Sequence, residues 1–92
     1  MKEQKQKRTL KLVKFYEYKR EEGTYYYINT QRILKKAYEL AGEYDIEILK
    51  FWESFPRDRV KIKVSFDERE NYIDFVNELV LEFSEYLETV KI

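Results

Sequence analysis

Lysines and aromatic residues recur along the strand-like segments of this chain, and together they suit the binding of nucleic acid. Lysine ammonium groups neutralise phosphates, while tyrosine and tryptophan rings stack on bases, each stack contributing about 1–3 kcal/mol. Sheet faces of RNA-recognition domains combine both kinds of side chain. We expect an open sheet face that consists of Lys14, Tyr16, Tyr18, Tyr25, Tyr27, Lys50, Trp52, Lys61 and Lys63.

The same aromatic residues also fit other surfaces. Tyr and Trp are common anchors of protein–protein contacts, although Lys is depleted there. Tyr and Lys also occur on ordinary solvated sheets. The sequence therefore leaves three readings open: contact with single-stranded or distorted nucleic acid, contact with a protein partner or a second copy in a homodimer, and a solvated surface.

A second candidate surface is acidic and lies on the last predicted helix. Its carboxylates fall on the face opposite the apolar stripe: Asp74, Glu78, Glu82 and Glu85. Such a row resembles the phosphates of a nucleic acid and could bind a basic protein, as an inhibitor does, or the basic half of another copy. An acidic row is also the ordinary exterior of a solvated helix.

The composition removes most catalytic and metal chemistry. The chain has 0 His, 0 Cys and 2 Gly, so it lacks the commonest general base, a thiol nucleophile and a glycine-rich phosphate loop. Asp58 and Asp67 are expected to serve as turn and cap residues. We predict a non-enzymatic binding module with no cofactor, no metal and no small-molecule substrate.

Charge and composition suggest where such a protein works. Residues 1–36 carry eleven basic and four acidic side chains, net +7, and residues 37–92 carry seven and fourteen, net −7. A charged fraction of 39% is typical of heat-tolerant proteins, and the Lys-, Tyr- and Ile-rich usage is typical of viruses and other mobile elements. Without a run of about 18 apolar residues or a signal-like start, we expect no membrane span and a cytoplasmic location, in the host cytoplasm if viral.

Two stretches 36 residues apart read almost alike: "LKLVKFYEY" at residues 10–18 and "IEILKFWES" at residues 46–54. In both, the apolar alternation slips by one residue, after Leu12 and after Ile48. A β-bulge at each slip shifts the side-chain phase and would place Lys14 and Lys50 on the same open face.

The coarse pattern predicts one α+β domain at residues 9–92 behind a flexible basic tail at residues 1–8, whose Lys2, Lys5, Lys7 and Arg8 could add phosphate contacts. Helices are expected from Asn29 or Thr30 to a stop at Gly42, and over residues 68–87. Strands are expected at residues 9–19, 24–28, 45–55 and 59–66.

These elements predict a pseudo-duplicated ββαββα fold, with halves at residues 9–44 and 45–88. Its four-stranded antiparallel sheet would carry both helices on one face. The alternative is a ferredoxin-like βαββαβ order, in which residues 24–28 are a loop and residues 88–92 form a strand.

The order of predicted elements, with "NTQRILKKAYELAG" between two hairpins, resembles the sheet region of LAGLIDADG homing-endonuclease domains. The resemblance implies a sheet face that reads DNA. The chain lacks the glycine-containing signature helix of that family and its catalytic acid, so the resemblance implies no nuclease activity and carries over no site residues.

Overall fold

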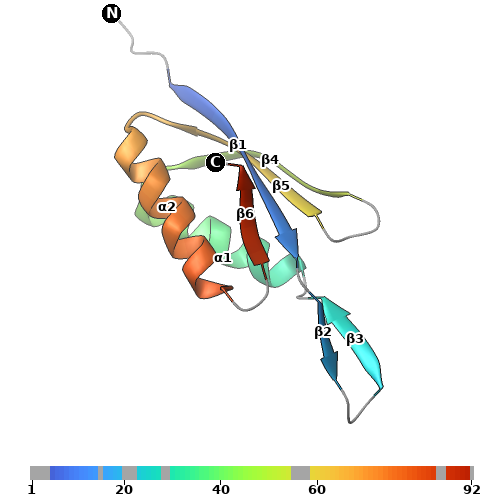
Figure 1. The fold of residues 1–92 in the computed structure, drawn as a ribbon. Coiled ribbons are helices and arrows are strands. Elements are labelled where there is room, and N and C mark those ends of the chain that lie inside the picture. Colours follow the sequence, from blue (N-terminus) through green and yellow to red (C-terminus); the bar gives the residue numbers. More distant parts are fainter. Residues whose placement is uncertain are drawn as a thin grey trace, which may run out of the picture.

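The computed structural model describes residues 5–14, 16–19, 23–27, 30–54, 59–84 and 87–91. An antiparallel sheet and two helices form an α+β fold (Figure 1). The elements, in chain order, are β1 (Gln6–Lys14), β2 (Tyr16–Lys19), β3 (Thr24–Tyr27), α1 (Thr30–Glu43), β4 (Glu47–Ser54), β5 (Arg59–Phe66), α2 (Arg69–Glu82) and β6 (Leu87–Lys91).

The sheet has the strand order β4-β5-β1-β6, and neighbouring strands run antiparallel. Three of its strands, β1, β4 and β5, come from segments in which the sequence predicts strands. The remaining strand is β6 rather than the predicted strand at residues 24–28. The sheet therefore does not show the pseudo-duplicated ββαββα order. The order β1-α1-β4-β5-α2-β6 matches the ferredoxin-like alternative, except that residues 24–27, a loop in that alternative, form strand β3.

β6 joins the sheet because α2 ends earlier than its apolar periodicity predicts. The helix ends at Glu82 instead of residue 87, and the backbone N–H of Phe83 donates to the carbonyl of Val80 at 3.2 Å. Phe83 is buried, so the turn after the helix is fixed to the core. The chain then returns antiparallel to β1 and pairs with residues 11–14 of that strand.

β2 and β3 form a two-stranded ribbon that is separate from the sheet and extends away from it (Figure 1). The sequence predicts this hairpin correctly, and Gly23 in its turn has φ of 65°, a conformation that suits glycine. The predicted single strand at residues 9–19 is instead divided between β1 and β2. Because β3 pairs with β2, it stays outside the main sheet.

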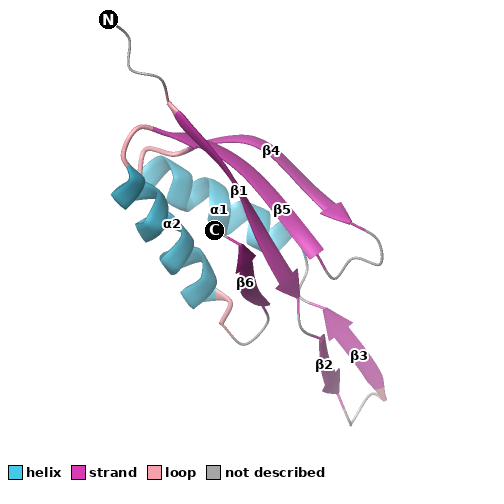
Figure 2. Cartoon of the chain, turned by 45° about the horizontal axis from the view of Figure 1, so that its top comes forward, coloured by secondary structure: helices cyan, strands magenta, loops and turns pink. Residues whose placement is uncertain are grey.

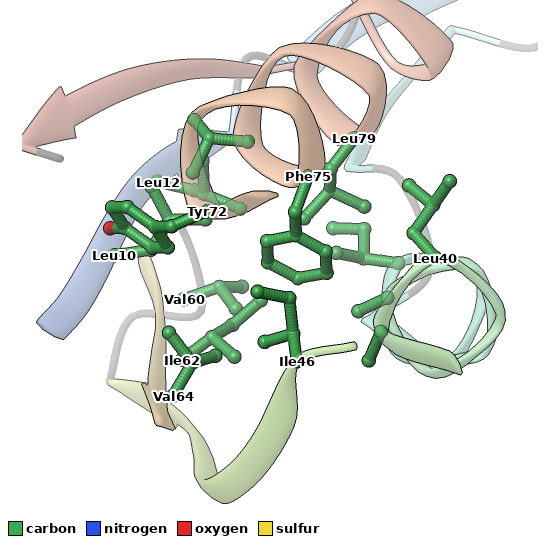
Figure 3. Close-up of a cluster of buried hydrophobic side chains, with 14 of the residues drawn as sticks. Leu10, Leu12, Leu40, Ile46, Val60, Ile62, Val64, Tyr72, Phe75 and Leu79 are labelled. Carbon is green, nitrogen blue, oxygen red and sulfur yellow. The ribbon is translucent and has the colours of Figure 1, made fainter. Parts of the chain in front are cut away.

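The hydrophobic core lies between the sheet and the two helices, which cover the same sheet face (Figures 2 and 3). Phe75 of α2 points into its centre, toward the strands and toward α1 (Figure 3). Burying each such side chain contributes about 1.5–3 kcal/mol. The core residues labelled in Figure 3 are Leu10, Leu12, Leu40, Ile46, Val60, Ile62, Val64, Tyr72, Phe75 and Leu79.

The ends of the helices differ from the predicted ones. Gly42 lies inside α1, which ends one residue later at Glu43. The end of the helix is closed by Asp45, which has φ of 56°, and by the N–H of Ile46, which donates back to an α1 carbonyl at 2.8 Å. A left-handed residue at this position is a common helix end. Asp67 does not cap α2, because the residue before the helix is Glu68. No helix among the described residues is long and apolar enough to cross a membrane.

The bulge predicted in the second of the two similar stretches is confirmed. Ile48 pairs with Val64, and Lys50 pairs with Lys63, so Leu49 is an extra residue in β4. The bulge reverses the side-chain phase along β4. Lys50 therefore falls on the open face of the sheet, opposite the helices.

The matching bulge predicted in the first stretch is absent. The pairing of β1 with β5 is continuous through Leu12 and Val13. β1 has neighbours on both sides, whereas β4 is an edge strand, where an extra residue disturbs only one ladder. A second register shift opposite Lys11 and Leu12 places its extra residue in β6, which is also an edge strand.

Candidate nucleic-acid interface

The open face of the sheet gathers basic residues in two adjacent rows across β4, β5 and β1. Neighbouring strands lie about 4.8 Å apart, and successive same-face residues along a strand lie about 6.6 Å apart. The pairing register defines the rows as Trp52–Lys61–Lys11 and Lys50–Lys63–Thr9. Four of the predicted site residues, Lys50, Trp52, Lys61 and Lys63, are therefore brought together as expected.

Lysines stand directly opposite one another in these rows. Lys61 is paired with Lys11, and Lys63 is paired with Lys50. Like charges in directly opposed positions destabilise a sheet. At position 91, β6 adds a further lysine opposite Lys11 in the register. The open face thus concentrates positive charge at cross-strand positions where pairs of opposite charge would give a more stable sheet.

Trp52 lies beside these lysines and is half-buried. The Lys50 ammonium lies 5.0 Å from the centroid of the indole ring, and the Lys61 ammonium lies 5.9 Å from it. Cation–π contacts contribute about 0.5–1 kcal/mol at exposed sites, so they offset part of the repulsion between the lysines. The ring and the cations form one continuous surface.

The basic face is hollowed into a shallow groove of about 710 Å³. Its lining residues are Lys7, Arg8, Thr9, Lys11, Trp52, Lys61 and Lys63. The described lining contains no carboxylate, and none of its lysines forms an ion pair with a described carboxylate. A groove with this lining favours a polyanion over a neutral or cationic ligand.

Sequence reasoning missed the contribution of β1 to this groove. It assigned Lys7 and Arg8 to a flexible tail and omitted Lys11, whereas β1 starts at Gln6 and carries all three. The signal was the alternation along β1, in which Lys7, Thr9 and Lys11 fall on the face opposite Leu10 and Leu12. Extending the predicted strand back to residue 7 would have identified the two lysines.

Lys14 does not belong to the open face, which corrects the sequence prediction. Without a bulge in β1, it follows Leu10 and Leu12 onto the helix-facing side and is only 4% exposed. Its ammonium lies 2.6 Å from a carboxylate oxygen of Glu53 and also donates to the Thr30 hydroxyl at the start of α1. The Thr30 hydroxyl in turn donates to Glu53. Lys14 therefore has a structural role.

The predicted tyrosines belong to the ribbon and not to the sheet that carries the lysines. In the register of β2 and β3, Tyr16 stands opposite Tyr27, and Tyr18 stands opposite Tyr25. These four positions share one phase of the ribbon. The placement of their rings lies outside what the structure describes, so the predicted platform is divided between two sheets.

The acidic surface predicted on α2 is present in part. Asp74, Glu78 and Glu82 are exposed on the helix, on the opposite side of the molecule from the basic groove, and Glu85 lies outside the described residues. Partial burial raises the pKa of Tyr44, and the nearby carboxylates of Glu78, Glu43 and Asp74 raise it further. Leu81 is 69% exposed between these acids.

No three carboxylates of the described ranges come together in a way that could hold a metal ion. The groove offers lysine ammonium groups, the Trp52 indole and, at its margin, the Arg8 guanidinium. Comparisons of the chain with family models, with curated proteins and with solved structures found no match. The geometry of the site is thus the basis for a functional conclusion.

Proposed function

We propose that this protein is a non-enzymatic binding module that contacts single-stranded or distorted nucleic acid through the open face of its sheet. The observation that carries the proposal is the presence of two pairs of directly opposed lysines next to Trp52: Lys61 with Lys11, and Lys63 with Lys50. An anionic backbone would relieve the repulsion within each pair. The indole adds a surface on which a base can stack.

The energetics of such a contact follow from its two components. Each phosphate neutralised by a lysine releases counterions, so affinity falls with salt by a logarithmic slope of about 0.7 per contact on a single strand. Stacking on an aromatic ring contributes about 1–3 kcal/mol per base and tolerates any sequence. We therefore expect salt-sensitive binding with little sequence preference.

The decisive experiment reverses charge on the open face. Lys61→Glu combined with Lys63→Glu should abolish binding of a fifteen-nucleotide thymidine oligonucleotide, measured by anisotropy of a fluorescent label at about 50 mM and about 200 mM salt. The matched control is Arg32→Glu combined with Lys35→Glu, which makes the same change in net charge on exposed residues of α1.

The control variant should bind as the wild type does. Equal loss in both variants would show that only net charge matters, and unchanged binding in the Lys61 and Lys63 variant would remove the proposed interface. Circular dichroism of each variant confirms that it is folded.

A second candidate function is contact with a protein through α2. Leu81 is 69% exposed and lies one helical turn after Glu78, at the edge of the acidic face, so a basic protein with an apolar recess would complement it. This surface would serve an accessory factor or inhibitor that mimics nucleic acid, or contact a second copy of the chain. Leu81→Lys should disrupt such a complex and leave oligonucleotide binding unchanged.

A further inference from the structure

We infer that the ligand is a single strand and that one of its bases replaces the lysine ammonium groups over Trp52 when it binds. This inference rests on the proposed function and specifies its ligand. The observation behind it is that two ammonium groups already lie over the ring, those of Lys50 and Lys61, at 5.0 and 5.9 Å from the ring centroid.

The lysines can leave the ring because a phosphate of the ligand replaces the indole as the partner of each ammonium group. Lysine has a flexible four-carbon stem, so its ammonium can swing from the indole to a neighbouring phosphate while its backbone stays in the sheet. A base that takes the vacated ring stacks on the indole, and each of the two displaced ammonium groups gains a phosphate in place of an exposed cation–π contact. Phosphate binding and stacking therefore support each other at Lys50 and Lys61.

The layout of the face fits one strand better than two. Lys61 and Lys63 lie two residues apart on β5, so phosphates of a chain that follows this strand would meet cations about 6.6 Å apart. Trp52 stands opposite Lys61 on the neighbouring strand, about 4.8 Å away. A nucleotide with its phosphate at Lys61 can thus lay its base over Trp52.

A regular duplex would use only half of this surface. Its base faces are stacked inside the helix, so it can offer phosphates to the lysines but no ring to Trp52. Inorganic polyphosphate likewise offers charge without bases. These two probes separate the role of Trp52 from the role of the lysines.

The experiment replaces Trp52 by Leu and compares three probes: a fifteen-nucleotide thymidine oligonucleotide, a duplex of the same length, and inorganic polyphosphate. Trp52→Leu should weaken oligonucleotide binding by about 5- to 150-fold, which is the contribution of one stacked base. It should leave the affinity for the duplex and for polyphosphate unchanged, as measured by calorimetry. Trp52→Phe should fall between the wild type and the Leu variant.

Tyr38→Leu is the matched control, because Tyr38 is an aromatic residue that is 56% exposed on α1. It should change none of the three affinities. In the wild type, the fluorescence of Trp52, the one tryptophan of the chain, should be quenched by the oligonucleotide and not by polyphosphate.

An oligonucleotide affinity unaffected by Trp52→Leu, or an equal loss for polyphosphate, would overturn this inference. Neither result would overturn the proposed function, which is tested separately by the charge reversal at Lys61 and Lys63. Loss of binding in the charge-reversal variant with no effect of Trp52→Leu would describe a purely electrostatic site.

Discussion

Two similar stretches of the chain, residues 10–14 and 46–50, place their final lysines on opposite faces of the sheet. Lys14 is 4% exposed and pairs with Glu53, whereas Lys50 is exposed and lies over Trp52. The residue type is the same and the local sequences are similar, but the surroundings differ. One lysine joins the sheet to the start of α1, and the other belongs to the exposed basic face of the sheet.

The cause of the difference is a single extra residue. In β4 the bulge at Leu49 moves Lys50 to the open face and brings Glu53 to the helix-facing side, where it meets Lys14. Each lysine therefore depends on the same bulge. The role of a lysine in a strand therefore depends on the side-chain phase of that strand, which decides the face of the sheet on which the lysine lies.

The largest effect is expected when the counter-charge of the buried lysine is removed. Glu53→Gln leaves the Lys14 ammonium in the interior without an ionised partner and should lower the free energy of unfolding by about 3 kcal/mol, measured by urea denaturation. The corresponding change on the open face, Lys63→Gln, should alter stability by less than about 0.5 kcal/mol, because Lys63 is exposed.

A double variant sharpens this contrast. Adding Lys14→Met to Glu53→Gln removes the unpaired charge and should recover most of the lost stability, since most of the cost of breaking a buried ion pair comes from the charge left without a partner. If Glu53→Gln is no more harmful than Lys63→Gln, the distinction between the two faces is wrong.

A smaller effect is expected at Tyr72, whose hydroxyl is buried without a hydrogen-bond partner among the described residues. Its ring stacks on Phe66 with centroids 4.6 Å apart, and Tyr72→Phe keeps that contact. Removing the unpaired hydroxyl should raise the free energy of unfolding by about 1 kcal/mol. A loss of stability would mean that the hydroxyl has a partner.

The same residue predicts a pH dependence. Burial raises the pKa of Tyr72 above its ordinary value of 10.0, and the nearby Arg8 guanidinium opposes the rise. Because the folded state holds this proton more tightly than the unfolded state, the stability it contributes is present below pH 10 and is lost as the pH rises through the folded pKa. As the pH rises above 10, the free energy of unfolding of Tyr72→Phe should therefore exceed that of the wild type by an increasing amount, as measured by urea denaturation at each pH.

The smallest effect is expected in the basic rows themselves. Lys11→Gln removes one member of the pair with Lys61 and should raise the free energy of unfolding by about 0.2–1 kcal/mol. It should also lower the salt slope of oligonucleotide binding by about 0.7. The control Lys35→Gln on α1 should change neither the free energy of unfolding nor the salt slope. A Lys11→Gln variant that is less stable than the wild type would show that the lysines of the open face do not repel one another.

Local pattern predicted much of the fold, because hydrophobic periodicity reports directly on which side of an element is buried. The alternation of residues 59–66 gave β5 with its observed bounds, and the turn at Gly23 marked the hairpin. The predicted slip in residues 46–54 is the bulge at Leu49. Lys50, Trp52, Lys61 and Lys63 were identified because the strand phase predicted for β4 and β5 was right.

The prediction failed where the outcome depended on distant partners. The similarity of the two stretches suggested equal bulges, but β1 lies in the centre of the sheet and β4 at its edge. The short segment Leu87–Lys91 has too few residues to outweigh the helical pattern before it, and it becomes a strand because β1 offers it an edge. Because β6 occupies that edge of β1, β3 pairs with β2 alone.

By itself, the sequence determined the kinds of element, the absence of histidine and cysteine chemistry, and the set of lysines and aromatic residues available for binding. Only the tertiary structure decided that Lys14 is buried while Lys11 and Lys50 face outward, and that the tyrosine positions belong to a separate ribbon. The physical reason is that side-chain phase and strand neighbours are set by hydrogen bonds between segments far apart in the chain, and a shift of one residue exchanges the two faces.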